Sequence, residues 1–488
     1  MKLNAEQIVK ALGGKLLSGN RNTSFASVST DTRTLREGEL FFALSGPNFD
    51  GHKFLAAAKN KGASGAVVSQ RPSGIGQLSE WPVIEVEDVP QALGQLASYH
   101  RHSISCRIVA ITGSAGKTTT KELIAHLLSE KLPGVKAPKS FNNDIGVPLT
   151  LLQIAEQDQF AVVEIGANDF GEIESLSKIV KPNIGLITCI GDAHLERFGS
   201  RWGVAWEKGH LIAGLPSEGI AILNADDQWC RHIAKLAGCK VIMYGESSDA
   251  DVRIDYLDAS EKGLSFIIDS ERFCLNVPGR HNALNAAGAV AVAREFGLTL
   301  TEISERMNSF RLPPMRMEMY RCGSVTVIAD QYNASPTSVS AAIEEYGRMK
   351  CCGRKVLVLG DMLELGAASG QLHSAVGERA AQESLTQFWT VGALALDAGK
   401  GAVRAGMDPQ SVRGCLSTEE ACRLIPEWVE PNDTLLLKGS RGMKLEALLS
   451  AIEDVYGPVA GGKEAERRQE KYESYRVSEY EQHLSEGA

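Results

Sequence analysis

The chain has 488 residues and an ordinary globular composition, with 43% hydrophobic and 23% charged residues. This length is too great for one hydrophobic core and predicts about three domains. The net charge of −9 disfavours nucleic acid as a partner, because nucleic-acid-binding proteins usually carry a basic face.

The sequence also argues against a membrane protein and against a disulfide framework. Its first residues do not have the pattern of a signal peptide, and no apolar run approaches the roughly 18 residues that a membrane span requires. The ten cysteines are scattered without C-x-x-C spacing, which is typical of a reducing compartment. We therefore expect a cytoplasmic α/β protein with no membrane span, and by default a monomer.

Short apolar runs alternate with helical patterns in the first part of the chain. Residues 65–68 and 82–86 predict strands, and residues 54–60 predict a helix. This small α/β unit, residues 1–105, is the first predicted domain.

The pattern becomes more regular after Arg107. Residues 108–112 predict a buried strand, which a glycine-containing turn and an amphipathic helix over 118–132 follow. Strand, glycine turn and helix together open a parallel, doubly wound sheet. Further buried strands are predicted at 159–165, 184–188 and 219–224, so we place a large nucleotide-binding domain at residues 106–318.

A second α/β series begins near residue 325. Strands predicted at 325–330, 355–360 and 434–438 define a third domain over residues 319–458. The remaining segment, 459–488, is charged and nearly free of aliphatic residues, so we expect an exposed and disordered tail.

The segment ITGSAGKTTTKE at 111–122 is the candidate nucleotide site. It has the G-K-T core of a phosphate-binding loop but lacks the first glycine of the common G-x-x-x-x-G-K-[ST] pattern. Gly113 and Gly116 allow backbone N–H groups to approach phosphate oxygens at a helix N-terminus. Lys117 can neutralise the β- and γ-phosphates, and the Thr118 hydroxyl can reach magnesium. The alternative is a strand-to-helix turn that happens to contain glycine.

Acids and bases at strand ends form a candidate metal site. Ligands of open parallel sheets bind beyond the carboxyl ends of the strands. Glu164 closes one predicted strand and His194 follows another, so both could meet an ion near Thr118. Oxygen and imidazole ligands suit a divalent ion, although His194 by itself is more typical of a capping or surface residue.

Further polar residues could contact the nucleotide. His281, Asn282 and Asn285 begin a small-residue helix and could face a base or ribose, but the alanine and glycine spacing is equally typical of close helix packing. Arg316 follows two prolines, which stiffen the chain and can aim its guanidinium at phosphate. Asp330 ends the next strand, where an acid before a turn is common.

These motifs, in this order, resemble the Mur ligases, the ATP-dependent amide-bond-forming enzymes of peptidoglycan synthesis. The resemblance covers about residues 25–450, and that family uses a short T-G-x-x-G-K-T-[TS] loop, which matches the missing first glycine. The most specific segments are NNDIGVPLTLL at 142–152, DQYNASPTS at 330–338, VLGDMLELG at 358–366 and LKGSRGMKLE at 437–446.

The resemblance implies a fold and an activity. The fold would combine a small N-terminal α/β domain, a central P-loop domain with a doubly wound, mostly parallel sheet, and a C-terminal Rossmann-like α/β domain. The enzyme would use ATP and Mg²⁺ to join D-alanyl-D-alanine to UDP-N-acetylmuramoyl-tripeptide through an acyl phosphate, with one domain per substrate closing to exclude water. Two alternatives stay open: a sibling Mur or folylpolyglutamate-type ligase with another amine, and a P-loop regulator that ligates nothing.

The resemblance also assigns roles to residues. The three catalytic residues would be Lys117, Lys208 and His194, and Lys208 matches a lysine that CO₂ carbamylates in the family. The nucleotide would be bound by Gly113, Ser114, Ala115, Gly116, Lys117, Thr118, Thr119, Asn282 at adenine, Arg316 at phosphate and Asp330 at ribose. The metal would be bound by Thr118, Glu164, His194 and Lys208. The substrates would be bound by Ser29, Asp31, Arg33, Asp50 and His52 at the UDP end, by Asn142 and Asn143, and by Tyr332, Asn333, Asp361 and Glu364 near the dipeptide.

Three positions depart from the family pattern. The family usually has Gly-Asn-x-Asn-Asn where this chain has Ser-Phe-Asn-Asn at 140–143. His210 replaces an acidic residue two places after Lys208, and Gln331 stands where cysteine or a small residue is common. The surroundings of Lys208 are therefore the least predictable part of the site.

Overall fold

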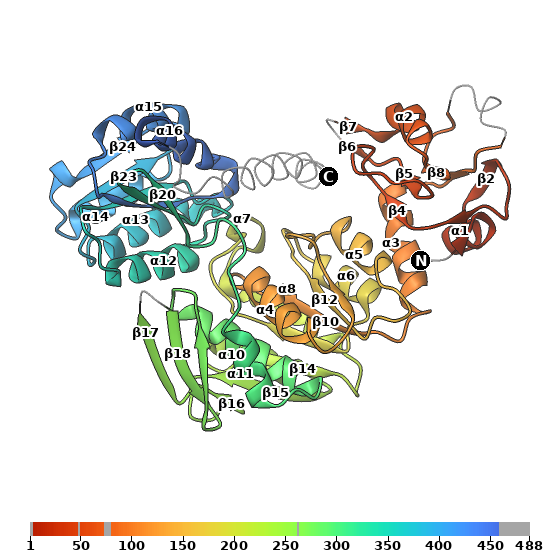
Figure 1. Cartoon of the computed structure of the whole chain (residues 1–488), viewed down its shortest axis with the longest axis horizontal. Helices are drawn as coiled ribbons and strands as arrows, with labels where there is room; N and C mark the ends of the chain where they lie inside the picture. Colours follow the sequence, from red (N-terminus) through yellow and green to blue (C-terminus); the bar gives the residue numbers. More distant parts are fainter. Residues whose placement is uncertain (1–2, 47–48, 73–79, 261–262, 458–488) are drawn as a thin grey trace.

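The computed structural model describes residues 3–46, 49–72, 80–260 and 263–457. Within these ranges three α/β units follow one another, and the central unit carries the N-terminal and C-terminal units at opposite ends (Figure 1). No helix in the described ranges is long and apolar enough to cross a membrane. The tail predicted at 459–488 lies outside the described residues.

The N-terminal unit contains a mixed sheet in the order β2-β9-β8-β5-β4. The strands predicted at 65–68 and 82–86 are confirmed as β8 and β9, which pair in parallel. The elements of this unit are β1 (Leu3–Asn4), α1 (Ala5–Leu12), β2 (Lys15–Ser18), β3 (Ser24–Phe25), β4 (Val28–Ser29), β5 (Leu40–Phe42), β6 (Ser45–Gly46), β7 (Phe49–Asp50), the 3₁₀ turn Gly51–Phe54, α2 (Leu55–Asn60), β8 (Gly65–Val68), β9 (Val83–Glu85) and α3 (Val89–Arg101).

The central unit contains the predicted parallel sheet, in the order β11-β12-β10-β13-β14-β15-β16. The chain starts at β10, extends to one side through β12 and then to the other side through β13. A crevice therefore opens beyond the carboxyl end of β10. The elements are β10 (Arg107–Thr112), α4 (Lys117–Ser129), β11 (Gly134–Lys136), α5 (Gly146–Leu152), β12 (Phe160–Glu164), α6 (Glu172–Val180), β13 (Ile184–Ile187), α7 (Leu195–Phe198), α8 (Arg201–Ala213), β14 (Ile220–Asn224), α9 (Gln228–Ile233), β15 (Lys240–Gly245) and β16 (Val252–Arg253).

An antiparallel sheet that the sequence analysis does not predict completes the central unit. It consists of β17 (Tyr256–Ser260), β18 (Gly263–Ile268) and β19 (Glu271–Leu275), and the helices α10 (His281–Glu295) and α11 (Leu300–Met307) follow it. Phe266 and Phe273 stack with ring centroids 5.4 Å apart and join a core that includes the alanine face of α10. Burial alternates along β18, which is the period-two pattern of a sheet with one covered face.

The C-terminal unit contains a sheet in the order β20-β21-β25-β22-β23-β24, in which β20 alone runs antiparallel to its neighbour. The strands predicted at 325–330, 355–360 and 434–438 are confirmed. The elements are β20 (Glu318–Cys322), β21 (Val325–Ala329), α12 (Pro336–Arg348), β22 (Lys355–Gly360), α13 (Ser369–Ala380), β23 (Gln387–Val391), α14 (Leu396–Arg404), β24 (Val412–Cys415), α15 (Thr418–Trp428), β25 (Thr434–Lys438) and α16 (Glu446–Tyr456).

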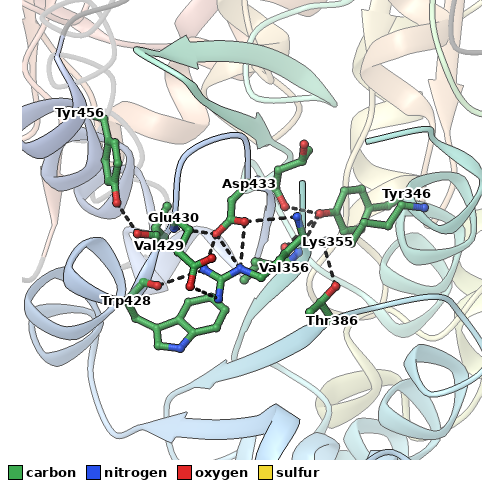
Figure 2. Close-up of polar contacts among 11 residues, drawn as sticks. Tyr346, Lys355, Val356, Thr386, Trp428, Val429, Glu430, Asp433 and Tyr456 are labelled. Atoms are coloured by element: carbon green, nitrogen blue, oxygen red, sulfur yellow. Dashed lines mark hydrogen bonds and ion pairs between the residues drawn. The ribbon is translucent and has the colours of Figure 1, made fainter. Parts of the chain in front are cut away.

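A polar network ties the starts of β22 and β25 together (Figure 2). Asp433, which is 1% exposed, accepts hydrogen bonds from Arg354, whose Nη2 lies 2.6 Å from Oδ2. The Arg354 guanidinium lies 4.0 Å from the centroid of the Trp428 ring, and the Tyr346 hydroxyl accepts from the Val356 N–H at 3.0 Å. Because these groups satisfy one another's hydrogen bonds, their role at this end of the sheet is structural. Polar residues that line a cavity, such as Asp330 and Lys438, lie at the opposite ends of strands of this sheet.

Candidate functional site

A cavity of about 990 Å³ lies where the units meet. The central unit contributes the loop after β10, the ends of β12 and β13, the start of α10 and the segment 139–146. The C-terminal unit contributes residues that follow β21 and β25, together with Leu363 to Leu365, and the N-terminal unit contributes Thr30 and Leu44. The cavity thus occupies the crevice that the strand order predicts.

The phosphate loop has the geometry of an anion site. Gly113 and Gly116 have φ values of +146° and +83°, in the left-handed region that favours glycine. A Cβ on Gly116 would lie 2.4 Å from Asn285 Oδ1, so the loop also needs glycine for space. No described side chain caps α4, which leaves the first N–H groups of this helix available to an anion. The predicted strand, glycine turn and helix are therefore confirmed.

Thr118, Glu164 and Arg316 converge beside this loop. Glu164 is 1% exposed and accepts hydrogen bonds from Thr118 Oγ1 at 2.9 Å and from Asn142 Nδ2 at 3.0 Å. Arg316 Nη2 donates to Thr118 Oγ1 at 2.9 Å, although 198 residues separate the two along the chain. Lys117 Nζ donates to the Gly113 carbonyl at 2.7 Å. The structure thus brings five predicted residues to the cavity wall: Lys117, Thr118, Asn142, Glu164 and Arg316.

The same wall suits a hard divalent ion. A buried carboxylate beside a hydroxyl is a donor set that magnesium prefers. Glu164 and Thr118 supply these oxygens, and both line the cavity. Among the described residues, however, no group of three or more His, Cys, Asp and Glu side chains comes together as a metal cage. The residues fit an ion that keeps other ligands from water or phosphate.

His194 and Glu364 contact each other across the boundary between the central and C-terminal units. His194 has a φ of +54°, and its Nδ1 forms an ion pair with the Glu364 carboxylate. The hydrogen bond from His194 lowers the pKa of Glu364. The predicted metal ligand and the predicted dipeptide contact are therefore partners in this conformation.

Lys208 lies on α8 with 1% of its surface exposed and lines the cavity. Burial, with added repulsion from Lys117, lowers the pKa of Lys208 to about 7. The neighbouring Glu207 carboxylate accepts from the backbone N–H groups of Gly171 and Ile173, and His210 lies 3.9 Å from it. Lys208 is thus an interior amine and not the solvated lysine that is usual on a helix.

Asn282 and Asp330 line the cavity but have protein partners. Asn282 Nδ2 donates to the Pro278 carbonyl at 2.7 Å, and its Oδ1 accepts from Asn285 Nδ2 at 3.0 Å. Asp330 Oδ2 lies 3.0 Å from Lys438 Nζ. These contacts fix the two side chains in the cavity wall, where a base and ribose would lie if the predicted roles hold.

The structure leaves several predicted substrate residues away from this cavity. Asp31 and Arg33 pair at 2.7 Å within the N-terminal unit, and Asp50 Oδ1 lies 2.9 Å from His52 Nδ1. Neither these four nor Ser29 are among the residues that line the cavity. Their predicted contacts with the UDP end of the substrate stay predictions.

Asp361 is the predicted dipeptide contact that fits its surroundings least. Its carboxylate points into the C-terminal unit, where Oδ1 accepts from the Ala395 N–H at 2.7 Å, and burial raises its pKa. Asp361 does not line the cavity, whereas Tyr332, Asn333 and Glu364 do. The geometry supports a structural role for Asp361, because the carboxylate organises the turn before α14.

Two buried lysines near the site were not predicted from the sequence. Lys438 is buried and donates to the Asn333 carbonyl at 2.7 Å, besides its pair with Asp330. Lys121 is fully buried one turn after Lys117. A lysine at the end of an apolar strand was the available signal for Lys438, but nothing in the local sequence separates Lys121 from a surface lysine.

Comparisons with known proteins agree with this geometry. The Mur ligase middle domain matches residues 111–293, the "Mur ligase, glutamate ligase domain" matches 315–441, and the Mur ligase family catalytic domain matches 24–101. The chain is 33% identical to the UDP-N-acetylmuramoyl-tripeptide--D-alanyl-D-alanine ligase of Bacillus subtilis (strain 168), over 93% of this chain and 98% of the relative.

Two solved structures are also similar to this chain. MurF from Acinetobacter baumannii has a TM-score of 0.84 and 31% identity, and the match covers 93% of this chain and 99% of that one. The MurF ligase from Thermotoga maritima in complex with ADP has a TM-score of 0.74 and 26% identity, over 88% and 97%. All three units and the phosphate loop lie within these matches, so the chain belongs to the Mur ligase family.

Proposed function

We propose that this chain uses ATP to join D-alanyl-D-alanine to UDP-N-acetylmuramoyl-tripeptide, the activity named for its full-length relative. The observation that carries the proposal is the single cavity in which the phosphate loop faces the segment after β21. That arrangement supports phosphoryl transfer at the phosphate loop, next to the unit that would bind the amine substrate. The product would be the pentapeptide precursor of peptidoglycan.

The reaction needs activation, because a carboxylate is a poor electrophile. The terminal carboxylate oxygen of the tripeptide forms a bond to the γ-phosphorus of ATP, the bridging P–O bond breaks, and ADP leaves. The dipeptide amine then attacks the acyl carbon, loses a proton and displaces phosphate. Lys117 and Arg316, both in the cavity wall, offset the charge on the transferring phosphoryl group.

Magnesium would be held by Thr118 and Glu164. When bound, the ion neutralises phosphate charge and aligns the phosphoryl group for transfer. His194 would join the metal through Nε2, since only its Nδ1 pairs with Glu364, and a carboxylate partner on the second ring nitrogen is usual for a metal-ligating histidine. The observation that supports this assignment is the buried carboxylate-hydroxyl pair at 2.9 Å.

Each unit would bind one substrate. In this proposal residues 1–105 bind the UDP end, 106–318 bind ATP, and 319–458 bind the dipeptide. Thr30 and Leu44 of the N-terminal unit reach the cavity, which supports a path for the muramoyl peptide toward the phosphate loop. We further propose a cytoplasmic monomer, which equilibrium sedimentation would test.

Carbamylation of Lys208 belongs to the same proposal. A pKa of about 7 leaves about half of the amine neutral near pH 7. The neutral amine nitrogen attacks the carbon of CO₂ and loses a proton to solvent, which converts the amine into a negatively charged carbamate in the cavity wall. Carbon-13 NMR of protein in labelled bicarbonate should show a carbamate signal that Lys208→Met removes.

A coupled phosphate-release assay tests the function. With the muramoyl tripeptide nucleotide and ATP, phosphate release should depend on D-alanyl-D-alanine, and mass spectrometry should show the pentapeptide product. Release with another amine but not with the dipeptide would indicate a sibling ligase. Release that is independent of any amine would contradict a ligase and favour a regulator.

A further inference from the structure

The loop between β11 and α5 connects the phosphate site to the C-terminal unit. Asn142 Nδ2 in this loop donates to Glu164, and the Gly166 N–H donates to the Asn142 carbonyl at 2.8 Å. Lys139 has a φ of +46°, which is unfavourable for any residue with a side chain. The loop is therefore held in a conformation that its own sequence does not favour, and something else must fix it.

Lys121 supplies the restraint. Its side chain is 0% exposed, and its Nζ donates to the carbonyls of Ala137, at 2.8 Å, and of Lys139. The Glu122 carboxylate lies 3.3 Å away. A buried ammonium is costly unless its N–H groups are satisfied, and here three acceptors surround it. The two carbonyls flank the peptide that leads into the strained residue, so Lys121 acts directly on the loop backbone.

The far side of the loop meets the C-terminal unit. The Tyr332 hydroxyl donates to Ser140 Oγ, and Ser140 belongs to the segment that departs from the family pattern. The Arg316 guanidinium lies 4.6 Å from the centroid of the Tyr332 ring, which is within the range of a cation–π contact. Arg316 in turn donates to Thr118.

These contacts form a closed circuit. It starts on α4 at Lys121, passes through the loop to Ser140, crosses to Tyr332 and Arg316, and returns to α4 at Thr118. Lys121 and Thr118 lie three residues apart and so share one region of the helix. A shift at either end of the circuit would move Arg316 relative to the phosphate loop.

We propose that Lys121 is a positioning residue for ligation. It fixes the loop 137–143 so that Ser140 can dock on Tyr332 when the C-terminal unit closes, which in turn sets Arg316 over the phosphate site. This inference rests on the proposed function, and it adds a residue that touches neither substrate nor metal.

A kinetic cycle in the full-length chain tests the proposal. Lys121→Met keeps the length of the side chain but cannot donate, and it should lower kcat about 30-fold while KM for ATP changes less than about threefold, since misplacement near the chemistry can cost about 100-fold. Tyr332→Phe and Ser140→Ala should each lower kcat about fivefold. Lys178→Met, an exposed lysine on α6 with one ion pair, is the matched control and should match the wild type.

Non-additivity distinguishes positioning from general destabilisation. The double variant Lys121→Met/Tyr332→Phe should be no slower than Lys121→Met alone, because both act through one route. Multiplicative losses, or a kcat for Lys121→Met within twofold of the wild type, would overturn the proposal. Should Lys121→Met fail to fold, Lys121→Gln takes its place; because Gln is shorter and neutral but retains a donor, kcat should fall by less than about 30-fold, and a kcat within twofold of the wild type would again overturn the proposal.

A readout without turnover separates this inference from the proposed function. Small-angle scattering with an ATP analogue and the nucleotide substrate should show compaction of the wild type and of Lys178→Met, but less of Lys121→Met and Tyr332→Phe. Compaction that Lys121→Met weakens, without ligation, would remove the proposed function and leave only the role of Lys121 in fixing the loop for closure. If the protein ligates and all four proteins compact equally, the proposed function would stand and the positioning role of Lys121 would be contradicted.

Discussion

The central unit meets its two neighbours through surfaces of different chemistry. On the N-terminal side, α3 packs on α5 and α6, and one apolar core continues from Leu96 through Ile108 to Leu151. On the C-terminal side, polar side chains pair across the boundary, Glu364 with His194 and Tyr332 with Ser140.

The difference indicates which junction is built to move. Opening an apolar junction exposes surface at a cost of about 25 cal/mol per Å², whereas polar contacts exchange with water at a net cost of only about 1 kcal/mol each. We therefore expect the N-terminal junction to stay closed and the C-terminal junction to open and close. A ligase that must exclude water and then release its product needs the second kind beside the phosphate site.

The largest effect should come from a residue that belongs to neither junction. Lys117→Ala should lower turnover at least about 1,000-fold, the loss expected on removing a main electrostatic group from a transition state. The free energy of unfolding should change by less than about 1 kcal/mol, since both junctions persist. Steady-state kinetics and urea titration measure the two quantities, with Lys178→Ala as control. Turnover within tenfold of the wild type would contradict the site.

The buried amine of Lys208 should make the free energy of unfolding depend on pH. Its folded-state pKa is about 7, against 10.5 for an ordinary lysine, so the unfolded chain binds more protons between these values. The contribution of Lys208 to the free energy of unfolding of the wild type therefore rises with pH between these two values. Lys208→Met should be more stable than the wild type at pH 6 in CO₂-free buffer, with a gain that shrinks towards pH 10. Equal gains at both pH values would argue against an interior ammonium.

A larger side chain at position 94 should disturb the packing of the apolar junction. A Cβ on this α3 residue would lie 3.2 Å from Ile179 Cδ1 on α6. Gly94→Leu should destabilise the protein by about 1–3 kcal/mol through overpacking and should raise KM for the nucleotide substrate. Gly94→Ala is the matched control, because its single methyl needs a shift of only a few tenths of an ångström. Equal stability of the two variants in urea unfolding would show that α3 is not tightly mounted.

The smallest effect on stability should come from the polar junction. Glu364→Gln removes the charge that pairs with His194, but the Glu364 side chain is 54% exposed, so solvent screening limits the change in unfolding free energy to less than about 0.5 kcal/mol. Closure should weaken all the same. In the wild type the lowered pKa of Glu364 means that the pair is complete above the ordinary carboxyl pKa and is lost as pH falls through the lowered value. Scattering at pH 7 and at a pH below the lowered value should show compaction that depends on pH in the wild type only; the same dependence in Glu364→Gln would place the titration elsewhere.

Elements with local signals could be predicted from the amino-acid pattern alone. The continuous apolar run at 108–112 predicts a strand buried on both faces, and that run is β10. The G-K-T turn predicts an anion site because glycine backbone and a helix N-terminus are local properties. Strand-end acids such as Glu164 were predictable for the same reason, since the parallel order fixes where strand ends gather.

Contacts between side chains that lie far apart in the sequence follow from the folded arrangement. Arg316 reaches Thr118, His194 pairs with Glu364, and Asp361 turns into its own unit instead of the cavity. Lys121 looks like a surface lysine until the loop of residue 139 packs over it. The physical reason is that local sequence sets the backbone conformation, whereas burial and pairing of a polar side chain depend on elements that lie far away along the chain.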